Sequence, residues 1–159
     1  MKLYIMRHGE ASWDAPSDQQ RPLTETGQWL SGQVARHLLA DKPQQLIVSP
    51  YLRAQQTRLA VLDVIGQVPC DTCALITPEG HTAAVIDWLY QYLADRPALT
   101  SLMLISHNPF VSDLISVLVD GHKRRGDSAL PVMSTSTLVT LQCDVVAAGC
   151  CQLIASYHD

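Results

Sequence analysis

Charged residues are scarce in this sequence, and several features of other protein classes are missing. Asp, Glu, Lys and Arg make up 16% of the 159 residues and leave a formal net charge of -4 at pH 7. Such a chain lacks the basic field that non-specific nucleic-acid binding needs, so we expect no nucleic-acid partner. No apolar run approaches the roughly 18 residues of a membrane span, and the N-terminus lacks a basic and then apolar leader. We therefore expect no membrane association and a cytoplasmic location.

The cysteines do not show the pattern of a disulfide framework. Their number is odd, which favours reduced thiols in a reducing compartment. The five are Cys70, Cys73, Cys143, Cys150 and Cys151. The first two form a CxxC, but no second pair or Cys/His cluster stands at a zinc-binding distance. We expect buried or strand cysteines, and we expect no metal and no cofactor.

What the chain does contain is apolar segments that alternate between strand and helix character. Nearly half of the residues (47%) are hydrophobic, and the length fits a single domain, 1–159. Strands are expected at 3–6, 46–48, 73–76, 102–105, 137–141 and 151–155, and helices at 24–40, from near 51, before 97 and at 110–119. This order predicts a three-layer α/β/α sandwich with a mainly parallel central sheet and right-handed crossovers.

The first strand ends abruptly at Arg7, His8 and Gly9. In an open parallel sheet, ligands bind at the carboxyl ends of the strands, where the following loops converge. Arginine offers a planar fork of donors suited to phosphate, and a neutral histidine acts as a base or nucleophile. Gly9 permits a backbone course, or a close approach to a ligand, that a side chain would block. The pattern indicates phosphate held beside a nucleophilic imidazole.

Three later strand ends in this interpretation carry residues that fit the same chemistry. Ser49 precedes a helix whose first turn contains Arg53, and helix N-termini favour anions. Glu79 and His81 follow the expected third strand, and His107 follows the fourth. Two arginines and two histidines at one edge make a donor-rich pocket of the kind that stabilises a transferring phosphoryl group.

These residues also carry a resemblance to a known family. The segments 6–10 (MRHGE), 49–57 (SPYLRAQQT) and 106–109 (SHNP) resemble the histidine phosphatase superfamily, the phosphoglycerate mutase-like enzymes. The length and the segment 21–27 (RPLTETG) are similar to the small bacterial phosphohistidine phosphatases of the SixA type. The resemblance implies a metal-independent phosphatase, without a large lid insertion, that acts on a phosphorylated histidine-containing signalling protein of a phosphorelay.

Carried over position by position, the resemblance makes His8 the nucleophile that accepts the phosphoryl group. Arg7 and Arg53 would grip its oxygens, and His107 would be a further donor. Arg21 would add a third cation from the polar loop 10–22. The expected substrate-binding residues are Arg21, Gly9 and Ser49.

The general acid is open at this point. In the wider superfamily a carboxylate protonates the leaving alkoxide, and Glu79 is our candidate, with His81 and Glu10 as alternatives. A phosphohistidine substrate relaxes this need, because an imidazole with a conjugate acid of pKa ~6.5 leaves as a neutral ring once it is protonated. The alternative functions are a small-molecule phosphomonoesterase and a non-catalytic phosphate-binding module; a mutase is disfavoured by the short chain.

Some further residues are expected outside the pocket. His37, His122 and His158 do not fall at a strand end that feeds it. The basic run Lys123–Arg125 has the character of a solvated loop, with docking of an acidic partner as the alternative. The tryptophans divide between the first long loop, where Trp13 lines the site or packs, and two helices, where Trp29 and Trp88 are expected in or near the core.

Overall fold

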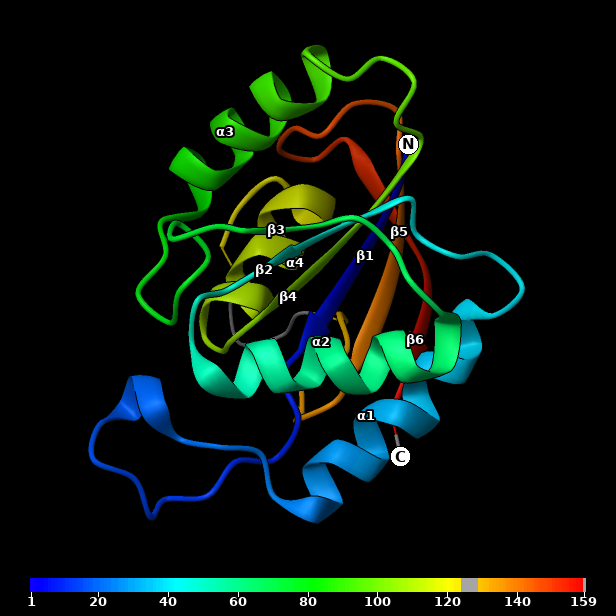
Figure 1. Cartoon of the computed structure of the whole chain (residues 1–159). Helices are drawn as coiled ribbons and strands as arrows, with labels where there is room; N and C mark the ends of the chain where they lie inside the picture. Colours follow the sequence, from blue (N-terminus) through cyan, green and yellow to red (C-terminus); the bar gives the residue numbers. More distant parts are fainter. Residues whose placement is uncertain (124–128, 159) are drawn as a thin grey trace.

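Strands and helices alternate along the chain in the computed structural model, which describes residues 1–123 and 129–158 (Figure 1). The strands are β1 Lys2–Arg7, β2 Gln45–Val48, β3 Cys70–Thr72, β4 Ser101–Ser106, β5 Leu138–Cys143 and β6 Cys151–Tyr157. The helices are α1 Glu25–Ala35, α2 Leu52–Ile65, α3 Thr82–Ala94 and α4 Phe110–Asp120, and the short 3-10 helices are η1 Asp18–Gln20 and η2 Arg36–Leu38. The expected order of four strand-helix units followed by two strands is confirmed.

The strands form a sheet in the order β3-β2-β4-β1-β5-β6. β4 lies parallel to both β1 and β2, and β3 lies parallel to β2. β5 runs antiparallel to β1, and β6 runs antiparallel to β5. The carboxyl ends of the four parallel strands therefore meet at one edge of the sheet, which is where open α/β proteins bind their ligands.

Successive side chains of β1 enter two separate cores. Leu3 and Ile5 pack on the side of α3 and α4, whereas Tyr4 and Met6 pack on the side of α1 and α2. A strand directs alternate side chains to opposite faces of its sheet, so a continuous apolar strand needs cover on both faces. The helices provide that cover (Figure 1), and the predicted three-layer α/β/α sandwich is confirmed.

The third strand lies earlier in the chain than we expected. The sequence predicted it at 73–76, whereas β3 spans Cys70–Thr72 at the edge of the sheet. Two of its three residues are exposed, so it carries no continuous apolar signal. The side chains of Cys73 and Ile76 are buried in the α3 and α4 core although their backbone is not in a strand. Burial in a turn thus imitated the pattern of a buried strand.

The first helix is shorter than its apolar periodicity indicates. The Thr24 side chain accepts a hydrogen bond from Gly27 N–H and caps α1, but the helix ends at Ala35 and tightens into η2, short of the expected end at residue 40. Trp29 on this helix is 61% exposed, so its expected core position is wrong, whereas Trp88 packs against the core.

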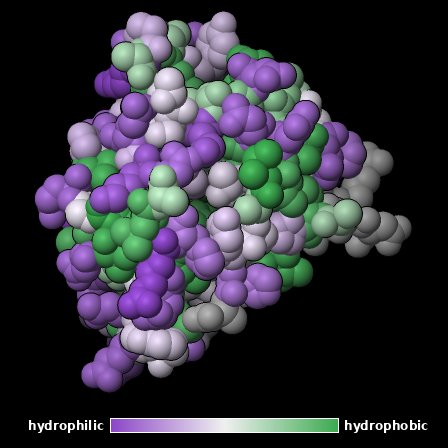
Figure 2. Space-filling view, turned by 90° about the vertical axis from the view of Figure 1, so that its right-hand side faces the viewer, coloured by the Kyte–Doolittle hydropathy of each residue, from purple (hydrophilic) through white to green (hydrophobic). Residues whose placement is uncertain are grey.

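On the face seen in Figure 2, apolar side chains lie in separate patches between hydrophilic ones.

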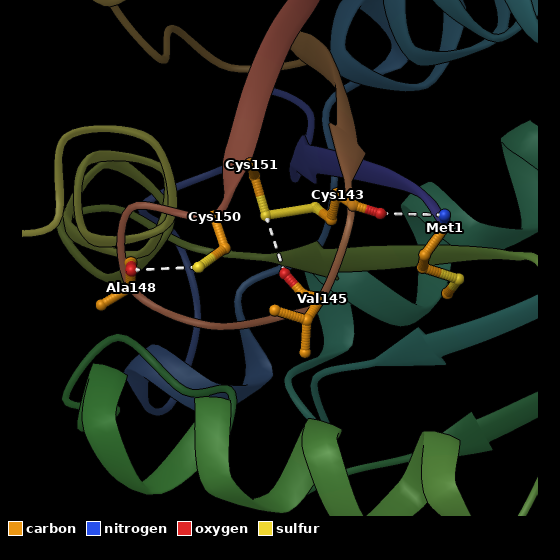
Figure 3. Close-up of a disulfide and its surroundings, with 6 residues drawn as sticks. All are labelled: Met1, Cys143, Val145, Ala148, Cys150 and Cys151. Carbon is orange, nitrogen blue, oxygen red and sulfur yellow. Dashed lines mark hydrogen bonds between the residues drawn. A yellow bond between two sulfur atoms is a disulfide. The ribbon is translucent and has the colours of Figure 1, made fainter.

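A disulfide joins Cys143 to Cys151 (Figure 3). β5 and β6 are register partners at this position, with a Cα–Cα distance of 4.1 Å, so the hairpin itself brings the two sulfur atoms together. The expectation of reduced thiols is therefore wrong for this pair. Free thiols are Cys70, Cys73 and Cys150 among the described residues.

In the same described part of the chain, no helix combines the length and the hydrophobicity of a membrane span.

Candidate active site

Strand ends bring the predicted phosphate-site residues to one edge of the sheet, near the start of α2 (Figure 1). Arg7 ends β1 and His8 follows it, Ser49 follows β2, and His107 follows β4. The β1 and β4 ends are tied together because His8 N–H donates to Ser106 O at 2.9 Å. Arg53 reaches the same place from the first turn of α2, with a side chain only 4% exposed.

His8 is held in a single orientation with one ring nitrogen left for chemistry. Its Nδ1 lies 2.6 Å from the carbonyl oxygen of Gly9, and a carbonyl only accepts, so Nδ1 carries the proton. Its Nε2 is then unprotonated, and the lone pair of this nitrogen accepts a hydrogen bond from Arg53 Nε at 3.2 Å. Burial lowers the pKa of His8 to about 4, the Gly9 hydrogen bond raises it, and the nearby arginine charges lower it further. The ring is therefore neutral at pH 7, as an attacking nitrogen requires.

His107 packs beside His8, with ring centroids 5.0 Å apart, and beside Tyr51 at 4.9 Å. Its Nε2 lies 2.7 Å from Ser49 Oγ. Burial, and next the neighbouring His8, lower the pKa of His107 to about 2. Ser49 is thus engaged with His107, an arrangement that depends on residues 58 positions apart and that the sequence alone did not indicate.

Two buried side-chain nitrogens of these residues lack a hydrogen-bond partner among the described residues: Arg7 Nε, which is a donor, and His107 Nδ1, which is a donor when Nε2 accepts from Ser49. The other end of the Arg7 side chain is fixed, because its Nη1 donates to Met133 O at 2.9 Å. Burial, together with the charge of Arg53, lowers the pKa of Arg7 from its ordinary value. Buried polar groups without partners are rare in folded proteins. Since the His107 ring lies 5.0 Å from the His8 ring and the charge of Arg7 acts on His8, these two nitrogens make the neighbourhood of His8 suited to an anion.

The charge of Arg21 lowers the pKa of His8 less than those of Arg53 and Arg7 do, and its side chain is engaged with its own loop. Its Nε and Nη2 donate to the carbonyls of Ser12 and Ala11 at 2.8 and 3.2 Å. Its guanidinium also stacks on Trp13, 3.5 Å from the ring centroid, and Trp13 itself is 83% exposed. These contacts show Arg21 organising the loop, while the expected substrate contact stays a prediction.

Asp18 is the member of the pocket that sequence reasoning missed. Its carboxylate accepts from Arg53 Nη2 at 3.0 Å and from Arg21 Nη1 at 3.2 Å. Its backbone oxygen also accepts from Arg53 Nη1 at 2.5 Å. The signal available in the sequence was an acidic residue three positions before an arginine, on a polar loop long enough to fold over the strand ends.

Gly9 supports the site through its backbone. Its N–H donates to Thr57 Oγ1 at 3.0 Å, and its carbonyl accepts from His8, so both of its polar groups are used within the protein. A Cβ at Gly9 would lie 2.5 Å from the carbonyl oxygen of Gly27 in α1. The structure thus shows a close approach of Gly9 to a helix, while the expected approach to a ligand stays a prediction.

A segment before β5 supports β1 from its other side. Ser136 N–H donates to His8 O at 3.1 Å, and Thr137 O accepts from Arg7 N–H at 3.0 Å. Ser136 adopts a φ of 62°, an uncommon backbone conformation for a residue with a side chain. Its hydroxyl lies 3.0 Å from that of Ser31 in α1, so the segment before β5 is also joined to α1.

The three candidates for a general acid lie on the surface. Glu79 is exposed, sits in a turn and not at a strand end, and its carboxylate makes no hydrogen bond or ion pair with any described residue. His81 is exposed at the start of α3. Glu10 is engaged with the Thr24 hydroxyl at 2.7 Å. The expectation that Glu79 follows the third strand directly is wrong because β3 ends at Thr72.

The remaining expectations concern metals and the basic loop. Within residues 1–123 and 129–158, no group of three His, Cys, Asp or Glu side chains is placed to hold a metal ion. Lys123 forms an ion pair with Asp113 at 3.1 Å, and the other two residues of the basic run, Arg124 and Arg125, lie outside the described residues.

Comparison with known proteins supplies independent evidence on the family. A sequence model of the histidine phosphatase superfamily (branch 1) matches residues 3–76. The phosphohistidine phosphatase SixA of Escherichia coli K12 is 34% identical over 159 aligned positions, which cover 94% of this chain and 89% of the relative. This chain belongs to the histidine phosphatase superfamily. The Haemophilus influenzae SixA homolog is 36% identical over 129 positions, covering 74% of this chain and 77% of that protein.

A solved structure of the superfamily has the same architecture. The protein histidine phosphatase SixA complexed with tungstate superposes with a TM-score of 0.85 at 30% identity, over 99% of this chain and 97% of that one. A mycobacterial glucosyl-3-phosphoglycerate phosphatase, at 15% identity and a TM-score of 0.75, shares the fold. The chain is thus a hydrolase of this superfamily, as its resemblance predicted.

Proposed function

We propose that this protein is a phosphohistidine phosphatase that removes the phosphoryl group from the phosphohistidine of a histidine-containing phosphotransfer protein. The observation that carries the proposal is the state of His8: a neutral ring with Nδ1–H bound to Gly9 O and the Nε2 lone pair directed to the arginine side of the pocket. The names of the E. coli and H. influenzae relatives support the substrate class. A cytoplasmic location belongs to the same proposal.

In the first step, His8 Nε2 attacks the phosphorus atom, and the P–N bond to the substrate imidazole breaks. The transferring group carries its charge on three equatorial oxygens. We assign Arg7 Nε, Arg53 and His107 Nδ1 as the donors to those oxygens, since Arg7 Nε and His107 Nδ1 are buried without a partner among the described residues and Arg53 contacts His8 Nε2. His107 donates from Nδ1 when its Nε2 accepts from the Ser49 hydroxyl. The leaving imidazole departs as a neutral ring after protonation.

In the second step, water attacks the phosphorus of phospho-His8 and the P–Nε2 bond breaks. Inorganic phosphate leaves, and the proton of the attacking water is released to solvent or to the phosphate. No step needs a metal ion in this scheme. Since the leaving imidazole takes a proton at a pKa near ~6.5, the first step does not depend on a carboxyl group as general acid.

The experiment compares phosphate release from a phosphohistidine-bearing phosphotransfer domain with release from p-nitrophenyl phosphate, in the presence of a chelator. Wild type is compared with His8→Ala and with Glu79→Gln. We expect release from the phosphoprotein only, a loss of at least about a thousandfold in His8→Ala, and a change of less than about threefold in Glu79→Gln. The exposed and unbonded Glu79 carboxylate is the reason for the last expectation.

Two results would redirect the assignment. Faster turnover of the monoester, with strong dependence on Glu79, would favour a small-molecule phosphomonoesterase that retains the phospho-His8 chemistry. Absence of release from both substrates, with tungstate still bound, would favour a phosphate-binding module. Acid-labile 32P on wild type, and its loss in His8→Ala, tests the intermediate directly.

A further inference from the structure

Arg53 presents two different edges to its surroundings. Its Nε faces the Nε2 of His8 at 3.2 Å. Its two terminal nitrogens face Asp18, with Nη1 on the backbone oxygen at 2.5 Å and Nη2 on the carboxylate at 3.0 Å. A guanidinium is a rigid planar fork, so holding its outer edge at two points fixes where its inner edge lies.

Asp18 is itself fixed by a second arginine that does not touch His8 through any hydrogen bond. Arg21 Nη1 donates to the other carboxylate oxygen of Asp18 at 3.2 Å. Arg21 is held in turn by the carbonyls of Ser12 and Ala11 and by the ring of Trp13. The carboxylate that orients Arg53 therefore belongs to a loop with its own internal bracing.

The balance of charge also indicates that Asp18 is the partner of Arg53. Arg53 is buried, with 4% of its side chain exposed, whereas 53% of the Asp18 side chain is exposed. A buried cation needs a compensating group, and Asp18 supplies one at the two terminal nitrogens of Arg53, whereas the Nε of Arg53 faces His8. The arrangement neutralises the outer edge of Arg53. Its inner edge donates to the lone pair of His8 Nε2, and that donor is released to an oxyanion when the lone pair attacks phosphorus.

We propose that Asp18 is a positioning residue: by holding the outer edge of Arg53, it sets the Nε edge against the phosphoryl group transferred to His8. The proposal rests on the proposed function, since it assigns the role of Asp18 in that reaction. It predicts that loss of Asp18 leaves Arg53 in the pocket but poorly oriented. The transition state then loses more stabilisation than the bound substrate, because it depends more strongly on donor geometry.

The test uses Asp18→Ala and Asp18→Asn in the full chain, with Asp14→Asn as the matched control. Asp14 lies exposed in the same loop, and its side chain makes no hydrogen bond or ion pair with a described residue. We expect Asp18→Ala to lower kcat on the phosphotransfer domain about ten- to a hundredfold while KM changes less than about threefold. Asp18→Asn, which keeps one acceptor oxygen, should recover part of kcat, and Asp14→Asn should match wild type.

Tungstate binding, measured by calorimetry on the same variants, gives a readout that needs no turnover. Asp18→Ala should weaken tungstate binding about tenfold while the variant still unfolds in one cooperative thermal transition. An increased kcat or tighter tungstate binding would overturn the proposal, because it would show that Asp18 competes with the oxyanion for Arg53. Unchanged kcat and tungstate affinity would also overturn it. If wild type binds tungstate but releases no phosphate from the phosphotransfer domain, the proposed function fails while the tungstate comparison still decides the role of Asp18.

Discussion

At the residue scale, the two pocket histidines connect the chemistry of the site to the stability of the protein. Burial lowers the pKa of His8 to about 4 and that of His107 to about 2, whereas an imidazole in the unfolded chain has a pKa near ~6.5. Below that value the unfolded chain binds protons that the folded protein does not, so the free energy of unfolding falls as pH falls. For His8 the loss extends from about pH 6.5 down to about pH 4 and stops once both states are protonated.

The prediction is a lower urea midpoint at pH 5 than at pH 7, with a smaller difference in His8→Gln. The smaller difference follows because glutamine takes up no proton in either state. His81→Gln provides the control, since that imidazole is exposed to solvent, and it should keep the wild-type difference. Equal pH dependence in wild type and His8→Gln would show that His8 does not hold a depressed pKa in the folded protein.

At the scale of elements, the site depends on how closely α1 approaches the end of β1. Gly27 lies in the first turn of α1, and a Cβ there would overlap the backbone of Glu10. Gly32 lies on the same helix, but the nearest atom to its Cβ would be 3.8 Å away. Alanine favours a helix over glycine by about 1 kcal/mol, whereas overpacking against backbone costs roughly 1–3 kcal/mol.

The two glycines should therefore respond in opposite directions to alanine. Gly32→Ala is expected to raise the thermal midpoint by about 2–4 °C. Gly27→Ala should lower the midpoint and reduce phosphate release, because the junction that carries Gly9 and the His8 carbonyl must shift. A rise in the midpoint for both variants would mean that α1 can move without disturbing the pocket.

The same scale separates what the sequence reveals from what it does not. The ends of β1, β2 and β4 were predictable because their apolar runs are continuous and stop at polar residues. β3 was misplaced because an exposed edge strand lacks such a run, while the buried turn residue Ile76 imitated one. Contacts such as Asp18 with Arg53 and Ser49 with His107 join positions 35 and 58 apart. They depend on loop paths and side-chain directions that periodicity does not encode.

At the scale of the whole molecule, the site and the disulfide lie at opposite ends of β1. Cys143 pairs with Met1, since the Met1 amino group donates to Cys143 O and Cys143 N–H donates to Met1 O. His8 follows the other end of the same strand. The disulfide closes a short hairpin loop, with its cysteines eight positions apart in the chain, and a loop of that size gives roughly 2–3 kcal/mol of stabilisation in the chain-entropy description.

Reduction should therefore weaken the fold without affecting the chemistry. We expect a reductant to lower the urea midpoint of wild type but not of Cys143→Ser/Cys151→Ser, and to leave phosphate release unchanged in both.

Alkylation of the denatured protein should label three cysteines without reductant and five with it, because three of the five cysteines are free thiols. Cys150→Ser is the control, since Cys150 is an exposed free thiol beside the bridge, and its urea midpoint should fall on reduction as that of wild type does. Five labels without reductant would show that the hairpin holds two thiols instead. Loss of phosphate release on reduction would show that the two ends of β1 are coupled through the sheet.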